Sequence, residues 1–80
     1  MRLCELKAGE TAVVDEIFTE GAMRRRLQDI GVIHGTELEC VGRSPGGDPA
    51  AYFIKGAVIA LRDEDSAQVS IRKTGGEKNG

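Results

Sequence analysis

The sequence has little that could hold nucleic acid or cross a membrane. Aromatic residues make up 4% of its 80 residues, and the formal net charge is −2. Nucleic-acid binding needs excess positive charge for the phosphates and, for single strands, aromatic rings on which bases stack. No apolar run approaches the roughly 20 residues that span a bilayer. We therefore expect no nucleic-acid partner and no direct membrane insertion.

The N-terminus also lacks the apolar core of a signal peptide, since an acid follows at once at Glu5. This predicts a cytoplasmic protein, which only a partner would recruit to the inner face of the cell membrane.

Cysteine is scarce as well. Cys4 and Cys40 are far apart and form no C-x-x-C pair of the kind found in zinc or redox sites. Each lies in an apolar pattern, so we expect both to be small, buried, reduced hydrophobic residues. The single histidine has no serine or cysteine arranged with it as a nucleophile. We predict that the protein is not an enzyme and needs no cofactor.

Alternating apolar and β-branched residues predict short strands. The expected strands cover residues 11–17, 37–41, 52–54, 57–61 and 68–72. In the first strand, Ala12 and Val14 point to the core while Ile17 is out of phase, which predicts a bulge near Asp15 and Glu16. The segment 57–61 is apolar throughout, so we expect it to be almost fully buried.

One segment has a helical period. Met23, Leu27 and Ile30 are spaced i, i+4, i+7, which predicts a single short helix within residues 21–30. Gly31 follows directly and can adopt the left-handed conformation that ends a helix.

A chain of this length buries only a small core, so five short strands and one helix would not form a stable open sheet. Closing the strands into a barrel removes the exposed edges, and the helix can plug one end. We therefore predict a mainly β fold, a small SH3-like barrel of about five strands with one short α-helix. The domain would cover residues 1–73, and residues 74–80 would form a flexible C-terminal tail.

An ordered set of short motifs resembles the FeoA family, whose domains read approximately L-x-x-L, G-x-x-A-x-V-x-x-I, R-R-L-x-x-L-G-L-x-P-G-T, G-D-P and V-x-G-x-x-I-A-L-R. The residues that carry the resemblance are Leu3, Leu6, Gly9, Ala12, Val14, Ile17, Arg25, Arg26, Leu27, Ile30, Gly31, Val32, Gly35, Thr36, Gly47, Asp48, Pro49, Ile54, Gly56, Ile59, Ala60, Leu61, Arg62, Val69 and Ile71. His34 departs from the pattern where the family commonly has proline, and Ser66 where it commonly has alanine.

The resemblance implies a small accessory protein of ferrous-iron uptake. Such a protein would act as an adaptor that binds the cytoplasmic domain of FeoB, the GTPase-coupled membrane transporter, and modulates it. The alternative is a metal-sensing SH3-like regulatory domain related to the C-terminal domain of iron-dependent repressors. Weak self-association also stays open, because small barrels with exposed edges often dimerise.

Two segments are candidates for contact with a partner. Arg24, Arg25 and Arg26 concentrate positive charge in an acidic chain, which suits either a solvated helix face or a docking patch. The loop 44–50 is rich in glycine but lacks the lysine of a phosphate loop, so we expect it to project as a contact element. The predicted partner-binding residues are Met23, Arg24, Arg25, Leu27, Pro45 and Asp48.

A metal site is not expected. Glu37 and Glu39 share a strand face that points away from Cys40, so they do not converge on a ligand set with His34. The acids 63–65 are expected to keep a loop in water.

Overall fold

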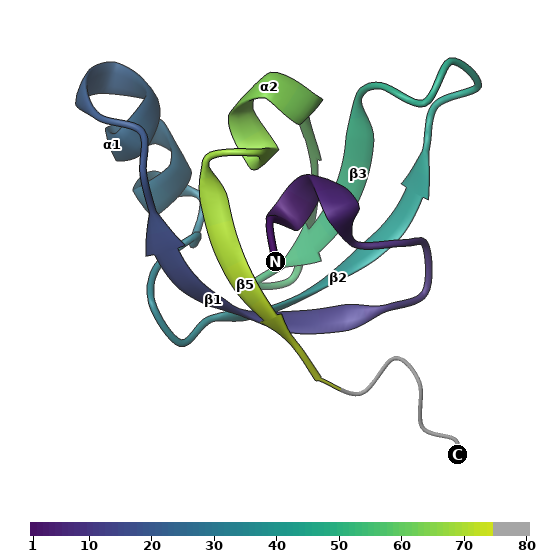
Figure 1. Cartoon of the computed structure of the whole chain (residues 1–80), viewed down its shortest axis with the longest axis horizontal. Coiled ribbons are helices and arrows are strands. Elements are labelled where there is room, and N and C mark those ends of the chain that lie inside the picture. The colour runs from purple at the N-terminus through teal and green to yellow at the C-terminus, as the bar shows by residue number, and fades with distance from the viewer. Residues whose placement is uncertain (75–80) are drawn as a thin grey trace.

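The sheet curls around one small core, and its two ends are the strands β4 and β5 (Figure 1). The computed structural model describes residues 1–74. Its five strands are antiparallel in the order β4-β3-β2-β1-β5. The elements in chain order are η1 Leu3–Glu5, β1 Thr11–Ile17, α1 Gly21–Asp29, β2 Glu37–Arg43, β3 Ala50–Ile54, β4 Ala57–Leu61, α2 Asp63–Ser66 and β5 Val69–Lys73.

Alternation along the strands fills the core, as predicted. Tyr52 on β3 is the largest fully buried side chain. The other buried apolar residues are Leu3, Leu6, Ala12, Val14, Leu27, Val32, Leu38, Cys40, Ala50, Ile54, Leu61, Val69 and Ile71. Burial raises the pKa of the Tyr52 phenol, which therefore stays neutral.

The predicted bulge in β1 is confirmed. The register of β1 against β5 shifts between Val14 and Glu16, so Asp15 has no opposite residue there. Val14 instead exchanges hydrogen bonds with the turn before β2, donating to the Thr36 carbonyl at 2.9 Å and accepting from the Gly35 N–H at 2.8 Å. The extra residue shifts the alternation of β1 by one position, so that Ile17 pairs with Val69 on β5.

The end of α1 is confirmed at Gly31, which has a φ of 106°. The Gly31 N–H donates to the Gln28 carbonyl (3.0 Å), and the Val32 N–H donates to the Leu27 carbonyl (2.8 Å). This is a Schellman motif, completed by the two buried side chains of Leu27 and Val32. A Cβ at Gly31 would lie 2.7 Å from Cγ of Lys55, so the close approach of the β3–β4 turn also requires glycine.

The prediction that segment 57–61 is almost fully buried is wrong. It is β4, an end strand that pairs only with β3 in the described chain. Ala57 and Ala60 are exposed, and the Val58 side chain is 62% exposed. Only Leu61 is fully buried, and Ile59 is partly so. An edge strand has one unpaired side, so its apolar composition alone does not place it inside.

Closure of the barrel is also incomplete. Within residues 1–74, β4 and β5 do not pair with each other, so the predicted removal of all edges does not occur. A second difference is α2, where a polar loop was expected. The Ala67 N–H donates to the Asp63 carbonyl at 2.8 Å, and acids in the first turn suit the positive end of a helix. Cys4 is partly rather than fully buried because it lies in η1 on the surface, while Cys40 is buried as predicted.

Thr74, the first residue of the predicted tail, is bonded to the start of β1. Its N–H donates to the Thr11 carbonyl at 2.9 Å, and the two hydroxyls are also 2.9 Å apart. The predicted tail otherwise lies outside the described residues. None of the helices in the part of the chain that the structure describes is long and apolar enough to span a bilayer.

Candidate functional site

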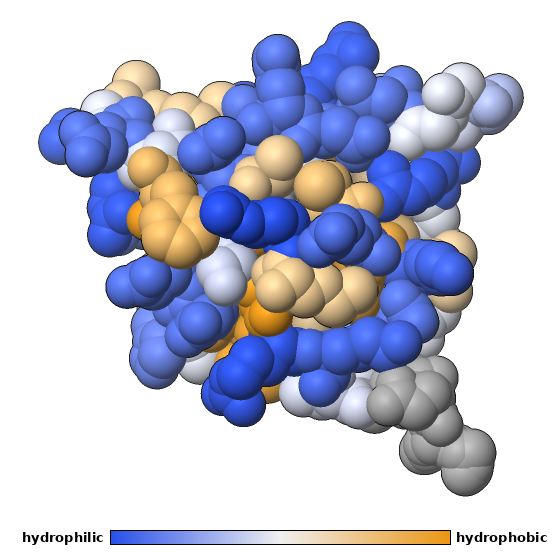
Figure 2. Space-filling model, viewed as in Figure 1, coloured by the Kyte–Doolittle hydropathy of each residue, from blue (hydrophilic) through white to orange (hydrophobic). Residues whose placement is uncertain are grey.

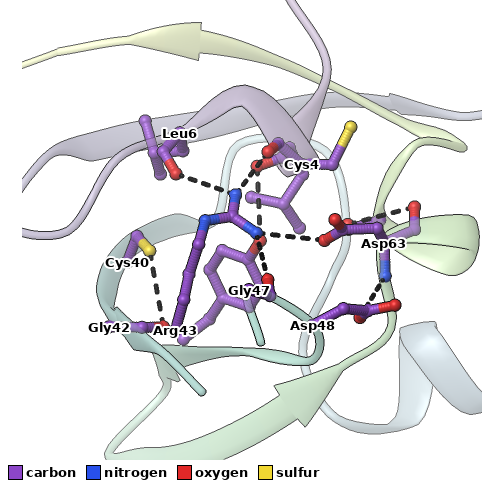
Figure 3. A network of polar contacts seen from close by, with 11 residues as sticks. Cys4, Leu6, Cys40, Gly42, Arg43, Gly47, Asp48 and Asp63 are labelled. Carbon is purple, nitrogen blue, oxygen red and sulfur yellow. Dashed lines mark hydrogen bonds and ion pairs between the residues drawn. The ribbon is translucent and has the colours of Figure 1, made fainter. Parts of the chain in front are cut away.

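The loop between β2 and β3 is held at its base by Arg43, a residue that the sequence did not single out (Figure 3). Its Nη1 donates to the Gly47 carbonyl and to Oδ1 of Asp63, both at 3.1 Å. Its Nη2 donates to the carbonyls of Leu6 (3.4 Å) and Cys4. One guanidinium therefore joins the loop to α2 and to the N-terminal segment.

The environment of Arg43 favours the charged form of its guanidinium. Burial alone would lower the pKa of its guanidinium, but the hydrogen bond that it donates to Asp63 and the electrostatic interactions with neighbouring groups outweigh that effect and raise the pKa. The Asp63 N–H in turn donates to Oδ1 of Asp48 at 2.9 Å (Figure 3). Asp48, a predicted contact residue, thus has a structural role, while Pro45 is exposed in the loop.

Helix α1 carries the predicted arginine patch. Nη1 of Arg24 donates to the Ile17 carbonyl at 2.8 Å and so ties the helix to the end of β1. Arg25 and Arg26 are exposed, and neither side chain makes a hydrogen bond or ion pair within residues 1–74. Their positive charge is therefore available to a partner.

The apolar side of α1 faces inward. Leu27 is fully buried, and Met23 is partly buried against the core. Leu27 therefore positions the helix rather than presenting a surface, whereas Met23 keeps part of its side chain accessible. Ile33, just beyond the helix, is 43% exposed and adds apolar surface to this end.

His34 lies beside the same end of the barrel. Its Nδ1 is 2.8 Å from the Asp15 carbonyl and 4.0 Å from Oδ1 of the same residue, and the imidazole is 78% exposed. A hollow of about 360 Å³ separates it from Arg24. In the described residues, no three His, Cys, Asp or Glu side chains are gathered as a metal-ligand set.

The structure does not bring the two predicted contact segments together. Helix α1 and the β2–β3 loop project at opposite ends of the barrel, with α2 between them (Figure 1). Met23, Arg24 and Arg25 form one candidate surface, and Pro45 with Asp48 lies at the other end. A small flat contact would cover one of these segments and not both.

A third surface was missed by sequence reasoning. Val41, Phe53 and Val58 are 44%, 45% and 62% exposed on β2, β3 and β4. Phe53 and Val58 are cross-strand partners, so they form one apolar area on the outside of the sheet. The signal was present in the sequence as apolar residues next to core residues, but only segment 57–61 was considered, and it was expected to be buried throughout.

Comparison with known proteins agrees with this fold. The FeoA domain family matches residues 1–73. The chain belongs to the FeoA family. The resemblance seen in the motifs is thereby confirmed, and FeoA domains are non-enzymatic accessory modules of ferrous-iron transport.

Individual relatives show the same relationship. The chain is 35% identical over 71 residues to a fusion of Fe(2+) transport protein A with the Fe(2+) transporter FeoB from Porphyromonas gingivalis, covering 89% of this chain and 8% of that protein. The solution structure of FeoA from Chlorobium tepidum matches with a TM-score of 0.89 and 33% identity, over 98% of this chain and 74% of that one.

Zinc-bound FeoA from Stenotrophomonas maltophilia, described as a procaryotic SH3 domain protein, matches with a TM-score of 0.80 and 31% identity, over 89% of this chain and 88% of that one. The predicted SH3-like fold is therefore confirmed. A manganese-dependent transcriptional repressor has the same fold at 19% identity and a TM-score of 0.81, over 92% of this chain and 41% of that one. At that identity the likeness concerns the fold alone.

Proposed function

We propose that this FeoA protein is a cytoplasmic adaptor that binds the cytoplasmic part of FeoB and modulates the transporter. The observation that carries the proposal is the fusion of a FeoA relative to FeoB in Porphyromonas gingivalis. Fusion keeps two domains at high effective concentration, which is useful where they work in contact. The separate chain would be recruited to the inner face of the membrane by the same contact.

The α1 end of the barrel is the proposed contact surface. It includes Arg25, which is exposed and unpaired within residues 1–74, Arg24 at the helix base, and the accessible part of Met23. Leu27 supports this surface from the core. Exposed arginines around a partly apolar side chain are typical of interface composition, and their charge would orient an acidic partner surface.

The β2–β3 loop is proposed as a second, separate contact through Pro45 and Asp48. Its base is already ordered by Arg43 and Asp63, as the hydrogen bonds at 3.1 Å and 2.9 Å indicate. A loop that is ordered before binding loses little conformational entropy in the complex.

The test is a titration of the protein against the cytoplasmic part of its cognate FeoB, with GDP and with a GTP analogue. Binding should weaken at least about tenfold in Arg25→Glu because a repulsive charge replaces an attractive one. Arg72→Glu on β5 is the matched control, since it makes the same charge change on another exposed residue, and it should bind as the unmodified protein does. Equal losses in both variants, or binding unchanged in Arg25→Glu, would overturn the α1 surface.

A difference in affinity between the two nucleotide states would support modulation of the GTPase cycle. Equal affinity in both states would support an adaptor that recruits or assembles the transporter instead. No binding in either state would overturn the proposal for the isolated cytoplasmic part.

A further inference from the structure

The outer edge of β4 is a bare strand edge. Ala57, Val58 and Ala60 are exposed, and β3 is the only strand that pairs with β4 within residues 1–74. Natural edge strands are usually interrupted by lysine, proline, a bulge or an inward charge, all of which discourage pairing with another chain. The strand Ala57–Leu61 has none of these, because all five residues are apolar and its register with β3 is continuous.

The turn before β4 determines which backbone groups face outward. Lys55 and Gly56 have φ values of 51° and 85°, as in a two-residue type I′ turn, so Ile54 and Ala57 form its hydrogen-bonded closing pair. Hydrogen-bonded and non-bonded pairs alternate along an antiparallel ladder. The N–H and C=O of Val58 and Ala60 therefore point away from β3, toward the open edge.

We propose that a second copy of this chain pairs with β4 across this edge, antiparallel and with Ile59 opposite Ile59. In this register Val58 lies opposite Ala60 of the second copy, and the two residues exchange both N–H···O bonds. Ala57 lies opposite Leu61 as a non-hydrogen-bonded pair, because the N–H and C=O groups of both residues point toward β3. Val58 and Leu61 thus each meet an alanine, Ile59 meets its own copy at the two-fold axis, and the strand places no like charges opposite each other.

The charges that flank β4 favour the same arrangement. Continuing the register brings Lys55 of one copy to the start of α2, Asp63–Ser66, in the other. Asp63 is bonded to Arg43, but Glu64 is exposed and makes no ion pair in the described chain. Because the two-fold axis repeats the contact, a lysine meets an acidic helix turn at each end. Arg62 falls opposite Gly56 and meets no cation.

The self-complementary pattern favours a second copy over an unrelated strand. A two-fold contact requires that a surface match itself, and this strand does so both in side-chain size and in flanking charge. The contact covers one five-residue strand, well below the area of a stable dimer. We expect a reversible dimer with a Kd on the order of 0.1–1 mM.

The first experiment is sedimentation velocity over a series of protein concentrations. The unmodified protein should shift reversibly from monomer to dimer. Ala60→Pro removes an outward N–H without removing a bond to β3, and it should weaken dimerisation at least about tenfold. Phe53→Thr is the matched control, because it removes an exposed apolar side chain next to β4 but leaves the edge intact, and it should still dimerise. Thermal unfolding of each variant shows that the fold is retained.

A charge exchange tests the register. Lys55→Glu and Glu64→Lys should each weaken self-association, because like charges then meet at both ends. An equimolar mixture of the two variants should restore association, since each end of the heterodimer again pairs a lysine with an acid. Only an antiparallel register that joins position 55 to position 64 gives this rescue.

Several results would overturn the proposal. These are a monomer at every concentration, loss of the dimer in Phe53→Thr but not in Ala60→Pro, or no rescue in the mixture. If the protein alone is monomeric but its binding to the cytoplasmic part of FeoB is lost in Ala60→Pro, the edge serves a different partner and self-pairing is wrong. Because the dimer is measured without FeoB, its failure is separate from any failure of the adaptor function.

Discussion

The two edge strands of the sheet differ in whether another segment of the chain bonds to them. Along β5, Ser70 forms a bridge with Arg2, and the Ile71 N–H donates to the Met1 carbonyl at 2.8 Å. Nη1 of Arg2 also donates to the Ala67 carbonyl at 3.1 Å, and its guanidinium lies 4.4 Å from the centre of the Phe18 ring. Along β4, no segment of residues 1–74 plays such a part.

Apolar side chains are exposed near both edges, but at β4 they lie on the edge strand itself. Over η1 and β5, polar side chains cross and surround a central group of apolar side chains (Figure 2). At β4, Val58 is 62% exposed beside Phe53 at 45%. The comparison teaches that this chain uses its own N-terminal segment to cover one edge and leaves the other edge uncovered within residues 1–74.

The largest effect is expected where the N-terminal segment enters the core. Leu3→Ala should lower the free energy of unfolding by about 3 kcal/mol, because Leu3 is fully buried and its loss leaves a cavity. Val58→Ala, on the bare edge, should lower it by less than about 1 kcal/mol. Urea unfolding at low protein concentration measures both. Equal losses would contradict the contrast between the edges.

A smaller loss of unfolding free energy is expected when the hydrogen bonds that Arg43 donates to the N-terminal segment and to α2 are removed. Arg43→Met keeps most of the aliphatic stem but leaves Asp63 and the carbonyls of Cys4, Leu6 and Gly47 without their donor. The expected cost is about 1.5–3 kcal/mol. Arg72→Met, at an exposed position on β5, is the control and should be nearly neutral.

Hydrogen exchange locates the effect of Arg43→Met. If the guanidinium holds the N-terminal segment in place, the Ile71 amide should exchange faster in this variant because its bond to Met1 opens more often. Unchanged exchange at Ile71 would show that the network stabilises the loop alone.

The smallest expected effect is on the pH dependence of stability, through the ion pair between Glu10 and Lys73 at the end of β5. The hydrogen bond with Lys73 (2.7 Å), together with the bond from the Lys7 N–H (2.8 Å), lowers the pKa of the Glu10 carboxyl. A lowered folded-state pKa stabilises the fold above the unfolded value near 4.5, and this contribution is lost as pH falls through the folded pKa.

Glu10→Gln should therefore make the loss of stability below that pH slightly shallower, as measured by thermal unfolding across an acid series. Glu64→Gln is the control, because Glu64 has no ion pair in the described chain. An unchanged acid slope in Glu10→Gln would show that the ion pair adds nothing to the covered edge.

Local patterns predicted most of the secondary structure. The strands at 11–17 and 57–61 have the predicted bounds, and α1 ends where Gly31 allows it. The bulge near Asp15 was predicted because Ile17 is out of phase with the alternation of Ala12 and Val14. Such features depend on residues close in sequence, whose periodicity and backbone preferences act locally.

The same patterns failed where the outcome depends on distant segments. Arg43 was not singled out because its acceptors at Cys4 and Leu6 lie 39 and 37 residues away. The interface residues Met23, Arg24, Arg25, Leu27, Pro45 and Asp48 remain predictions for a complex, although Leu27 and Asp48 now have structural roles.

The sequence by itself determined the five strand segments and the helix α1, because alternation, helical period and turn residues act over a few neighbours, and its ordered motifs indicated the FeoA family. Only the tertiary structure decided which edge is covered. The strand at 57–61 is more apolar than the one at 69–73, yet it is the exposed one, since the N-terminal segment pairs with β5 and not with β4. Burial depends on what the rest of the chain places beside a strand, and no local pattern contains that information.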